Sequence, residues 1–352
     1  MQAEKKDIKS LLPEEVSSVL ADLGEPAFRA KQVYKWLRGP IGSFEDMKNI
    51  PKALRERLGE EYYIYTPRVL RKQVSKLDGT TKYLWELRDG NAVETVIMRY
   101  KHGNTVCVSS QVGCRMGCAF CASTIGGKVR NLTASEILDQ VMYSERDSGL
   151  PISNIVMMGI GEPLDNYDNV LRFLRLVNDP EGMNIGMRHI SLSTCGLTDG
   201  IDRLGENDLQ LTLSVSLHAP DDVTRNKIMP VNRSCGVEKL MDTCRRYFDR
   251  TGRRISFEYA MIDGVNDSRA HAQRLAALLR GTGSHVNLIP LNEVEESPLK
   301  PSKPENLRAF MAVLEENGIN VTVRRKLGPD ISASCGQLRR KRELEKSSEN
   351  VE

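Results

Sequence analysis

The chain has 352 residues, 40% of them hydrophobic and 28% charged, and its formal net charge is +3. Its eight cysteines are too sparse for a disulfide-stapled scaffold, and the composition is that of an ordinary globular protein. No signal peptide follows Met1 and no apolar run reaches bilayer length, so we expect a cytoplasmic protein without a membrane partner.

Residues 1–60 are expected to form a helical accessory domain. Apolar residues recur at helical spacing over 11–23 and over 28–37, and a glycine with a nearby proline ends each run. The second run has a basic opposite face, made by Arg29, Lys31, Lys35 and Arg38. This face is either ordinary solvated surface or a place for phosphate contact, and the sequence leaves both open.

A β-meander is expected over residues 61–100, linking the helices to the rest of the chain. Its three β-rich runs are separated by Asp-Gly turn signals at 78–79 and 89–90. Glu94 lies in the last run, among Val93, Val96 and Ile97. A carboxylate in so apolar a run either faces solvent or is a base placed there for chemistry.

From residue 101 to residue 338, expected strands alternate with amphipathic helices. The expected strands are Thr105–Ser109, Ile155–Met158, Ile190–Ser193, Leu211–Ser216, Ile255–Ala260, Val286–Ile289 and Asn320–Val323. A capping box at Thr133–Glu136 predicts the start of one helix. Such units give parallel strands, either in an open doubly wound sheet or in a full or partial barrel. Residues 339–352 are almost wholly polar and are expected to be a disordered tail.

Three cysteines stand at C-x3-C-x2-C spacing on one short stretch: Cys114, Cys118 and Cys121. Three thiolates so placed can ligate three irons of a four-iron cluster and leave the fourth iron open. A structural zinc site would need a fourth ligand, usually from a second Cys or His pair, and the other cysteines stand singly. The spacing favours the open iron–sulfur cluster over zinc or unliganded thiols.

Polar residues follow several of the expected parallel strands, where they would meet at one face of a barrel. They are Gly161 and Glu162, Ser193, the run Ser216-Leu217-His218, and Asn292. Taken singly, each has an ordinary explanation as a turn glycine, a helix cap or a structural histidine. Taken together, they suit a small ligand that carries an amine, a carboxylate and hydroxyl groups.

A last candidate is Cys335, which lies among small residues between the basic runs 324–326 and 339–342. Nearby positive charge favours the thiolate and therefore nucleophilic chemistry. The alternative is an inert cysteine buried in a turn.

Read together, these motifs resemble the RlmN/Cfr family of radical S-adenosylmethionine (SAM) RNA methyltransferases, and the RlmN branch more closely. The resemblance rests on the cysteine stretch, Gly161-Glu162-Pro163, Ser216–Pro220 and Ala333–Leu338, and extends from the N-terminal helices to Leu338. It implies an α/β fold: a partial β/α barrel, the radical SAM core, with a small N-terminal helical and β-meander accessory region.

The resemblance also implies roles for individual residues. Cys114, Cys118 and Cys121 would ligate a [4Fe-4S] cluster, and the polar strand-end residues Gly161, Glu162, Ser193, Ser216, Leu217, His218 and Asn292 would contact SAM. Cys335 would become methylated, Glu94 would accept a proton, and Cys107 would form a transient disulfide with the methyl-carrying cysteine.

The implied reaction is methylation of carbon 2 of adenosine in 23S rRNA and often in tRNA. This carbon is electron-poor and has no nucleophilic pair with which to attack a sulfonium methyl group, so a radical route is needed. Two SAM molecules would be used per turnover: one methylates Cys335 and the other gives a 5′-deoxyadenosyl radical. An electron donor such as flavodoxin or ferredoxin would reduce the cluster.

Two other functions remain open from the sequence. A Cfr-type carbon-8 methyltransferase would share the same cysteines, although Pro163 favours the carbon-2 enzyme. A non-catalytic RNA-binding protein with a structural metal would also explain the cysteine stretch and the basic runs.

Overall fold

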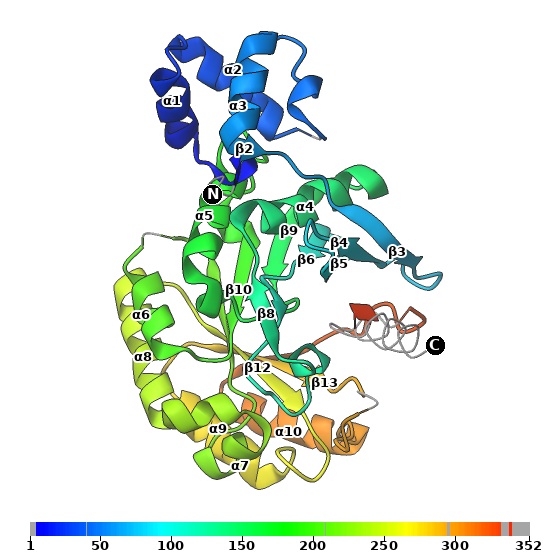
Figure 1. Cartoon of the computed structure of the whole chain (residues 1–352). Helices are drawn as coiled ribbons and strands as arrows, with labels where there is room; N and C mark the ends of the chain where they lie inside the picture. Colours follow the sequence, from blue (N-terminus) through cyan, green and yellow to red (C-terminus); the bar gives the residue numbers. More distant parts are fainter. Residues whose placement is uncertain (1–4, 40, 208, 294–295, 332–337, 340–352) are drawn as a thin grey trace.

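A ten-stranded mixed sheet forms the centre of the computed structural model, which describes residues 5–39, 41–207, 209–293, 296–331 and 338–339. The strand order is β14-β13-β12-β11-β10-β9-β6-β5-β4-β3. Figure 1 shows the sheet in the body of the molecule, with the N-terminal helices as a separate lobe above it. Within the described ranges, no helix is long and apolar enough to span a membrane.

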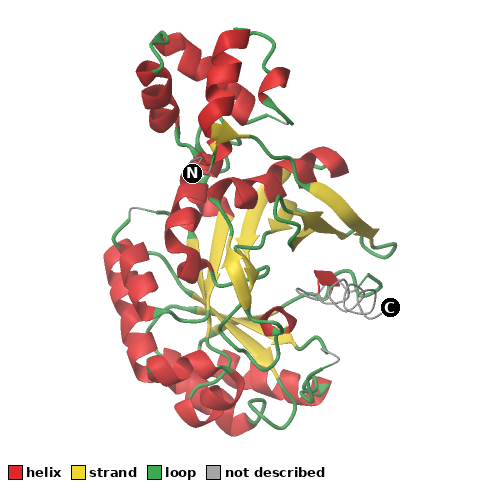
Figure 2. Cartoon of the chain, viewed as in Figure 1, coloured by secondary structure: helices red, strands yellow, loops and turns green. Residues whose placement is uncertain are grey.

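Seven strands of the described sheet pair in parallel and build the barrel. They are β6 (Gly103–Cys107), β9 (Ile152–Met157), β10 (Ile190–Thr194), β11 (Thr212–Ser216), β12 (Ser256–Met261), β13 (His285–Pro290) and β14 (Asn320–Val323). The helices between them are α4 (Ala134–Ser148), α5 (Tyr167–Asn178), α6 (Thr198–Gly205), α7 (Asp222–Ile228), α8 (Gly236–Thr251), α9 (Arg269–Leu279) and α10 (Pro304–Glu316). Figure 2 shows helices arranged around the outside of the curved sheet. Strands β9 to β14 lie side by side in chain order, without the reversal of a doubly wound sheet, and β14 and β3 stand at opposite ends of the strand order; the described sheet is therefore an open, partial barrel.

The expected meander is confirmed, and it continues the barrel sheet. Strands β3 (Arg68–Val74), β4 (Thr81–Glu86) and β5 (Ala92–Tyr100) pair antiparallel, and β5 then pairs antiparallel with β6. Gly79 and Gly90 adopt positive φ in the two turns, as hairpin turns require. The meander therefore forms one wall of the same sheet.

The predicted capping box is confirmed at the start of α4. The Thr133 hydroxyl accepts from the Glu136 N–H at 3.2 Å, and the Glu136 carboxylate accepts from the Thr133 N–H at 2.9 Å. Gly149 ends the helix in the left-handed conformation. These local signals fix α4 between β8 (Lys128–Asn131) and β9, with its apolar face in the main core.

The N-terminal lobe has its own hydrophobic core. It contains α1 (Pro13–Asp22), α2 (Ala27–Leu37), α3 (Lys52–Glu61) and a short parallel pair, β1 (Lys6–Asp7) with β2 (Tyr62–Tyr63). A buried ion pair joins it to the barrel, with Lys9 Nζ lying 2.6 Å from Asp139 Oδ2 on α4.

Candidate active site

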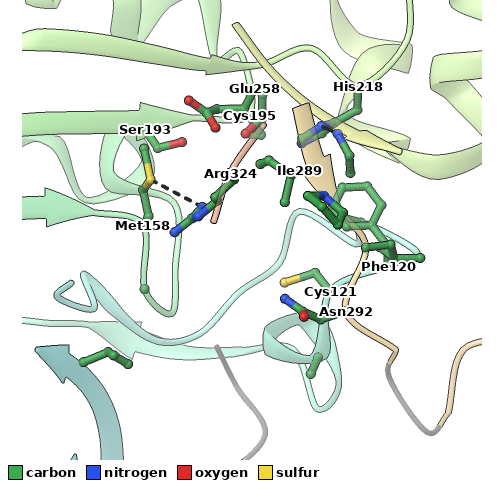
Figure 3. A pocket seen from close by; sticks show the side chains of 18 of the residues that line it. Phe120, Cys121, Met158, Ser193, Cys195, His218, Glu258, Ile289, Asn292 and Arg324 are labelled. Atoms are coloured by element: carbon green, nitrogen blue, oxygen red, sulfur yellow. Dashed lines mark hydrogen bonds between the residues drawn. The ribbon is translucent and has the colours of Figure 1, made fainter. Parts of the chain in front are cut away.

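The carboxyl ends of the parallel strands surround one pocket of about 520 Å³ (Figure 3). Its wall comes from the ends of β9 to β13, from β5, from residues 324–329 after β14, and from the loop that carries the three cysteines of the motif. We call this loop, Cys114–Cys121, the cysteine loop. The strand-end residues that line it include Gly161, Glu162, Ser193, Ser216, His218 and Asn292. In Figure 3, Cys121 and Asn292 lie below Ser193 and His218 around the same cavity.

The cysteine loop is closed at its base by a short hairpin, β7 (Gln111–Gly113) with β8 (Lys128–Asn131). The Cys114 N–H donates to Gly127 O at 3.1 Å, where the hairpin ends. The Ala119 N–H donates to Ile228 O at 2.9 Å and so holds the middle of the loop against the end of α7. All three cysteines of the motif line the pocket.

The donor set of this loop fits a four-iron cluster. Burial raises the pKa of the Cys114 thiol to about 11 and also raises the pKa of Cys118, whereas a metal would deprotonate both. Among the described side chains, no three of Cys, His, Asp and Glu are grouped to hold one metal ion. A cluster does not require such a group, because its three thiolates bind three different irons.

Glu162 presents a buried carboxylate to the pocket. Its Oε1 accepts from the Leu164 N–H at 3.0 Å and its Oε2 accepts from the Cys195 N–H at 2.7 Å. Burial raises the pKa of this carboxyl, and the hydrogen bond from Cys195 opposes the shift. Each carboxylate oxygen has further acceptor capacity, so Glu162 can also bind an ammonium group.

His218 is held as a neutral imidazole. Its Nδ1 accepts from the Ala260 N–H at 2.9 Å, which leaves the ring proton on Nε2. Burial lowers the pKa of His218 to about 3, and the charge of Arg225 adds to this effect. The ring meets Phe120 of the cysteine loop edge-on, with centroids 4.9 Å apart. His218 therefore connects the end of β11 to the loop.

The two strand-end serines, Ser193 and Ser216, are half-buried, and Asn292 is exposed at the pocket edge. Leu217 differs from them, because its side chain is buried in the main core. Only its backbone is near the site: its N–H donates to Glu258 O at 3.1 Å.

Arg225 on α7 holds two of these strand ends together. Its fully buried guanidinium donates to the carbonyl oxygens of Cys195 (2.7 Å), Ser216 (3.0 Å) and Leu217 (2.9 Å). It also donates to Asn232 Oδ1 at 2.7 Å. One side chain thus fixes the residues that follow β10 and β11.

Glu94 and Cys107 lie on the meander side of the pocket. Cys107 is buried in a cluster with Val96 and Met98, which themselves line the pocket. Glu94 is buried on β5, and its Oε2 lies 2.9 Å from Lys82 Nζ on β4. Its Oε1 accepts from the Arg339 N–H at 2.7 Å.

Cys335 lies outside the described residues, but the chain on either side of it is anchored to the meander. Asp330 accepts from the Ser75 hydroxyl at 2.7 Å and from the Lys76 N–H at 2.9 Å. Leu338 is buried against Leu84 and Ala92. The predicted disordered tail also lies outside the described residues, apart from Arg339.

Comparison with known proteins identifies the family. Residues 7–64 match the ribosomal RNA large subunit methyltransferase N-terminal domain, and residues 108–276 match the radical SAM superfamily. The chain is 51% identical over 338 residues to a probable dual-specificity RNA methyltransferase RlmN from Lachnoclostridium phytofermentans, covering 96% of this chain and 95% of the relative. The chain belongs to the RlmN family of radical SAM RNA methyltransferases.

Two further proteins agree with this membership of the RlmN family. A probable dual-specificity RNA methyltransferase RlmN from Clostridium tetani is 51% identical over 328 residues, which cover 93% of this chain and 94% of the relative. A crystal structure of a radical SAM methyltransferase from Sphaerobacter thermophilus superposes with a TM-score of 0.88 at 44% identity, covering 94% of this chain and 98% of that one. The protein is therefore a radical SAM RNA methyltransferase, and its family implies a [4Fe-4S] cluster and SAM.

Two charged residues line this RlmN-family pocket without having been predicted to do so: Glu258 was not singled out in the sequence, and Arg324 was expected only as part of a basic run near Cys335. Glu258 on β12 lines the pocket and accepts from Asn287 Nδ2 at 2.8 Å; burial raises its pKa, and the charge of Arg324 opposes that shift. Arg324 follows β14 and approaches the Met158 sulfur at 4.0 Å (Figure 3). The signal that singled out Glu94, a carboxylate in an apolar strand, applies equally to Glu258.

Proposed function

We propose that this enzyme methylates carbon 2 of adenosine in 23S rRNA and tRNA through an S-methylcysteine on Cys335. One observation carries the proposal: the buried thiol of Cys107 packs directly behind the pocket that the cysteine loop lines. The cluster needs only the three thiols of the cysteine loop, so the thiol of Cys107 on the meander side of the pocket suits a separate role in thiol exchange. The match of residues 7–64 to a ribosomal RNA methyltransferase domain and the dual-specificity names of the relatives support the two RNA classes.

The residues of the pocket divide between the cluster and SAM. Cys114, Cys118 and Cys121 would hold the [4Fe-4S] cluster, which supplies the electron that cleaves SAM to a 5′-deoxyadenosyl radical. Glu162 would accept from the SAM amine. The remaining strand-end residues would bind the SAM carboxylate, hydroxyls and adenine, with Gly161 and Leu217 contributing backbone groups and His218 acting as a neutral donor through Nε2. They are Gly161, Ser193, Ser216, Leu217, His218 and Asn292.

Cys335 and Cys107 would carry the methyl group and release the product. A first SAM methylates the Cys335 thiolate, and a second turns its methyl group into a methylene radical that bonds to carbon 2. Transfer of the ring proton to Glu94, and of one electron back to the oxidised cluster, would leave a thioether between Cys335 and adenine. The Cys107 thiolate then attacks the Cys335 sulfur: the S–S bond forms, the S–CH2 bond breaks, and the carbon takes up a proton.

The adenosine must be unstacked for its carbon 2 to reach the pocket. Of the expected basic face of α2, Lys31 and Lys35 are exposed, whereas Arg29 pairs with Glu25 and Arg38 donates to the carbonyl oxygen of Lys9. The two lysines and the basic residues 324–326 would contact RNA phosphates. A cellular one-electron donor, such as flavodoxin or ferredoxin, would reduce the cluster.

Three cysteine variants test the proposal. Cys335→Ala should abolish RNA methylation while iron, sulfide and the absorption spectrum of the cluster stay at parental levels. Cys107→Ala should instead accumulate a covalent protein–RNA adduct, visible as a slowly migrating species on a denaturing gel. Cys244→Ala, which changes a buried cysteine of α8 in the main core, should methylate RNA like the parent. Normal turnover by Cys107→Ala would show that the assigned role of Cys107 is wrong.

A further inference from the structure

A buried ion pair stands beside the candidate proton acceptor. The Lys82 and Glu94 side chains are 0% and 3% exposed, and Lys82 Nζ lies 2.9 Å from Glu94 Oε2. The two residues come from neighbouring strands, since Lys82 is opposite Val96 and Glu94 is opposite Leu84 in the β4–β5 register. Side chains at alternate positions of β5 share one face, so Glu94 points to the same side as the pocket-lining Val96 and Met98.

A carboxylate in this position needs a charged partner to remain ionised. Burial in an apolar environment favours the protonated form of a carboxyl group, and a nearby cation reverses that preference. A protonated Glu94 could not accept a proton from substrate. Lys82 supplies the cation from the sheet itself, where β4 is paired on both sides, with β3 and β5.

Among the residues that the structure describes, further charged and titratable groups lie on the elements packed around Glu94. On the elements packed against this face they are Cys107 of β6 and Arg339 of the C-terminal turn, whose backbone N–H donates to Glu94 Oε1. The Arg339 guanidinium lies near Gly113, beside the cysteine loop. Glu86 of β4 pairs with Arg68, and Arg130 of β8 pairs with Asp89 and Glu136. On the opposite face of the sheet, Asp139 of α4 pairs with Lys9.

We propose that Lys82 is a positioning residue that keeps Glu94 ionised in its buried site and aims its carboxylate for proton removal from the adenine ring. This inference rests on the proposed function. In the step concerned, the C2–H bond breaks, its electron pair stays with the ring, and the proton forms an O–H bond on Glu94. Lys82 keeps its own proton throughout and does not touch the substrate.

The pH dependence of methylation separates this role from a structural one. Methylation by the parent enzyme should not show the steep pH dependence described next for Lys82→Met, because the Lys82 ammonium 2.9 Å away favours the carboxylate form of Glu94. In Lys82→Met, Glu94 must lose its proton unaided, so single-turnover methylation should be low at neutral pH and rise about tenfold per pH unit. Lys82→Arg keeps the positive charge and should retain the parental profile.

Lys72→Met is the matched control, because Lys72 on neighbouring β3 pairs with Asp147 at 2.6 Å but is partly exposed. It should keep the parental profile. Infrared difference spectra, which do not depend on activity, should show a protonated carboxyl band in Lys82→Met that Lys82→Met/Glu94→Gln lacks.

Three results would overturn the inference: an equal loss at every pH in Lys82→Met, the steep profile in Lys82→Arg, or the absence of that carboxyl band. Glu94→Gln distinguishes this failure from failure of the proposed function. Full carbon-2 methylation by Glu94→Gln would show that Glu94 takes no part in the reaction. If Glu94→Gln is inactive but methylation by Lys82→Met does not depend on pH, only the role of Lys82 is refuted.

Discussion

The ionisation of His218 links the pocket to the stability of the folded protein. Burial lowers its pKa from 6.5 to about 3, so the folded protein binds fewer protons here than the unfolded chain between these values. The folded state therefore loses stability as pH falls through that window. When the pH falls from about 7.5 to about 5.5, this one group should lower the free energy of unfolding by about 1.4 kcal/mol.

We expect His218→Gln to remove that part of the pH dependence. Glutamine has no proton to gain in the unfolded chain, so the parent should lose about 1.4 kcal/mol more than the variant over the same pH change. Urea unfolding of the two proteins at both pH values measures the difference. Equal losses would mean that His218 is not held neutral by the fold. His102→Gln, at an exposed histidine in the turn between β5 and β6, is the control and should behave like the parent.

At the residue level, much of the pocket could be predicted from the sequence, because its polar residues lie at or within a few residues of the carboxyl ends of parallel strands; they are Glu162, Ser193, Ser216, His218 and Asn292. The residues that support them could not. Arg225 looks like an ordinary polar residue of a short helix, and only the fold shows that its guanidinium binds the carbonyls after two strands. The residues next to Lys82 in the sequence do not indicate that it pairs with Glu94, because the two side chains meet only when β4 pairs with β5.

Among the elements, the turn after β9 depends on Gly161. Its φ is +108°, and a Cβ placed there would lie 2.6 Å from the Gln111 Cβ, with the Gln111 backbone nitrogen at 2.8 Å. The Gln111 side chain also accepts from the Glu162 N–H at 2.9 Å. A larger residue at 161 would therefore displace Glu162 as well as the turn.

We expect Gly161→Ala to weaken SAM binding by about tenfold or more, corresponding to about 1.4 kcal/mol of lost contact. Equilibrium binding of SAM to the anaerobically purified holoenzyme measures it. Gly149→Ala is the matched control, because Gly149 also has positive φ but has open space around its Cβ position. It should cost about 1 kcal/mol of stability without changing SAM affinity. Parental SAM affinity in Gly161→Ala would contradict this account of the turn.

Element positions in the barrel followed from local patterns, but some boundaries and pairings did not. Strand β6 ends at Cys107 instead of the expected Ser109. The Ser109 N–H donates to the Gln140 side chain of α4 at 2.8 Å, so it leaves the strand ladder. The pairing of the meander with the barrel, through β5 and β6, was likewise not predicted. Turn signals indicate that neighbouring strands form a hairpin, but not which strand of the barrel the hairpin then pairs with.

For the molecule as a whole, the buried pair of Lys9 and Asp139 connects the N-terminal lobe to the barrel. Burial raises the pKa of Asp139 to about 6, and the charge of Lys9 opposes that shift. We propose that residues 1–60 form an accessory domain seated on α4 through this contact. The Asp7 carboxylate accepts from the Ser135 hydroxyl at 2.6 Å and adds to the same junction.

Lys9→Met should lower the free energy of unfolding by about 3–5 kcal/mol, because it leaves Asp139 buried without its cation. Urea denaturation measures the loss. Lys52→Met is the control, since Lys52 forms only an exposed 3.7 Å pair with Glu56 within α3, and it should change stability by less than about 0.5 kcal/mol. A similar small effect in Lys9→Met would mean that the junction does not depend on this pair.

The central proposal for the molecule as a whole is that it transfers a methyl group to carbon 2 of adenosine in RNA. It is tested most directly by mass spectrometry of nucleosides from ribosomal RNA and tRNA of cells with and without the gene. We predict that 2-methyladenosine disappears from both RNA classes in the deletion strain and returns with the parental gene, but not with a Cys335→Ala version. Loss of 8-methyladenosine with 2-methyladenosine unchanged would contradict the account.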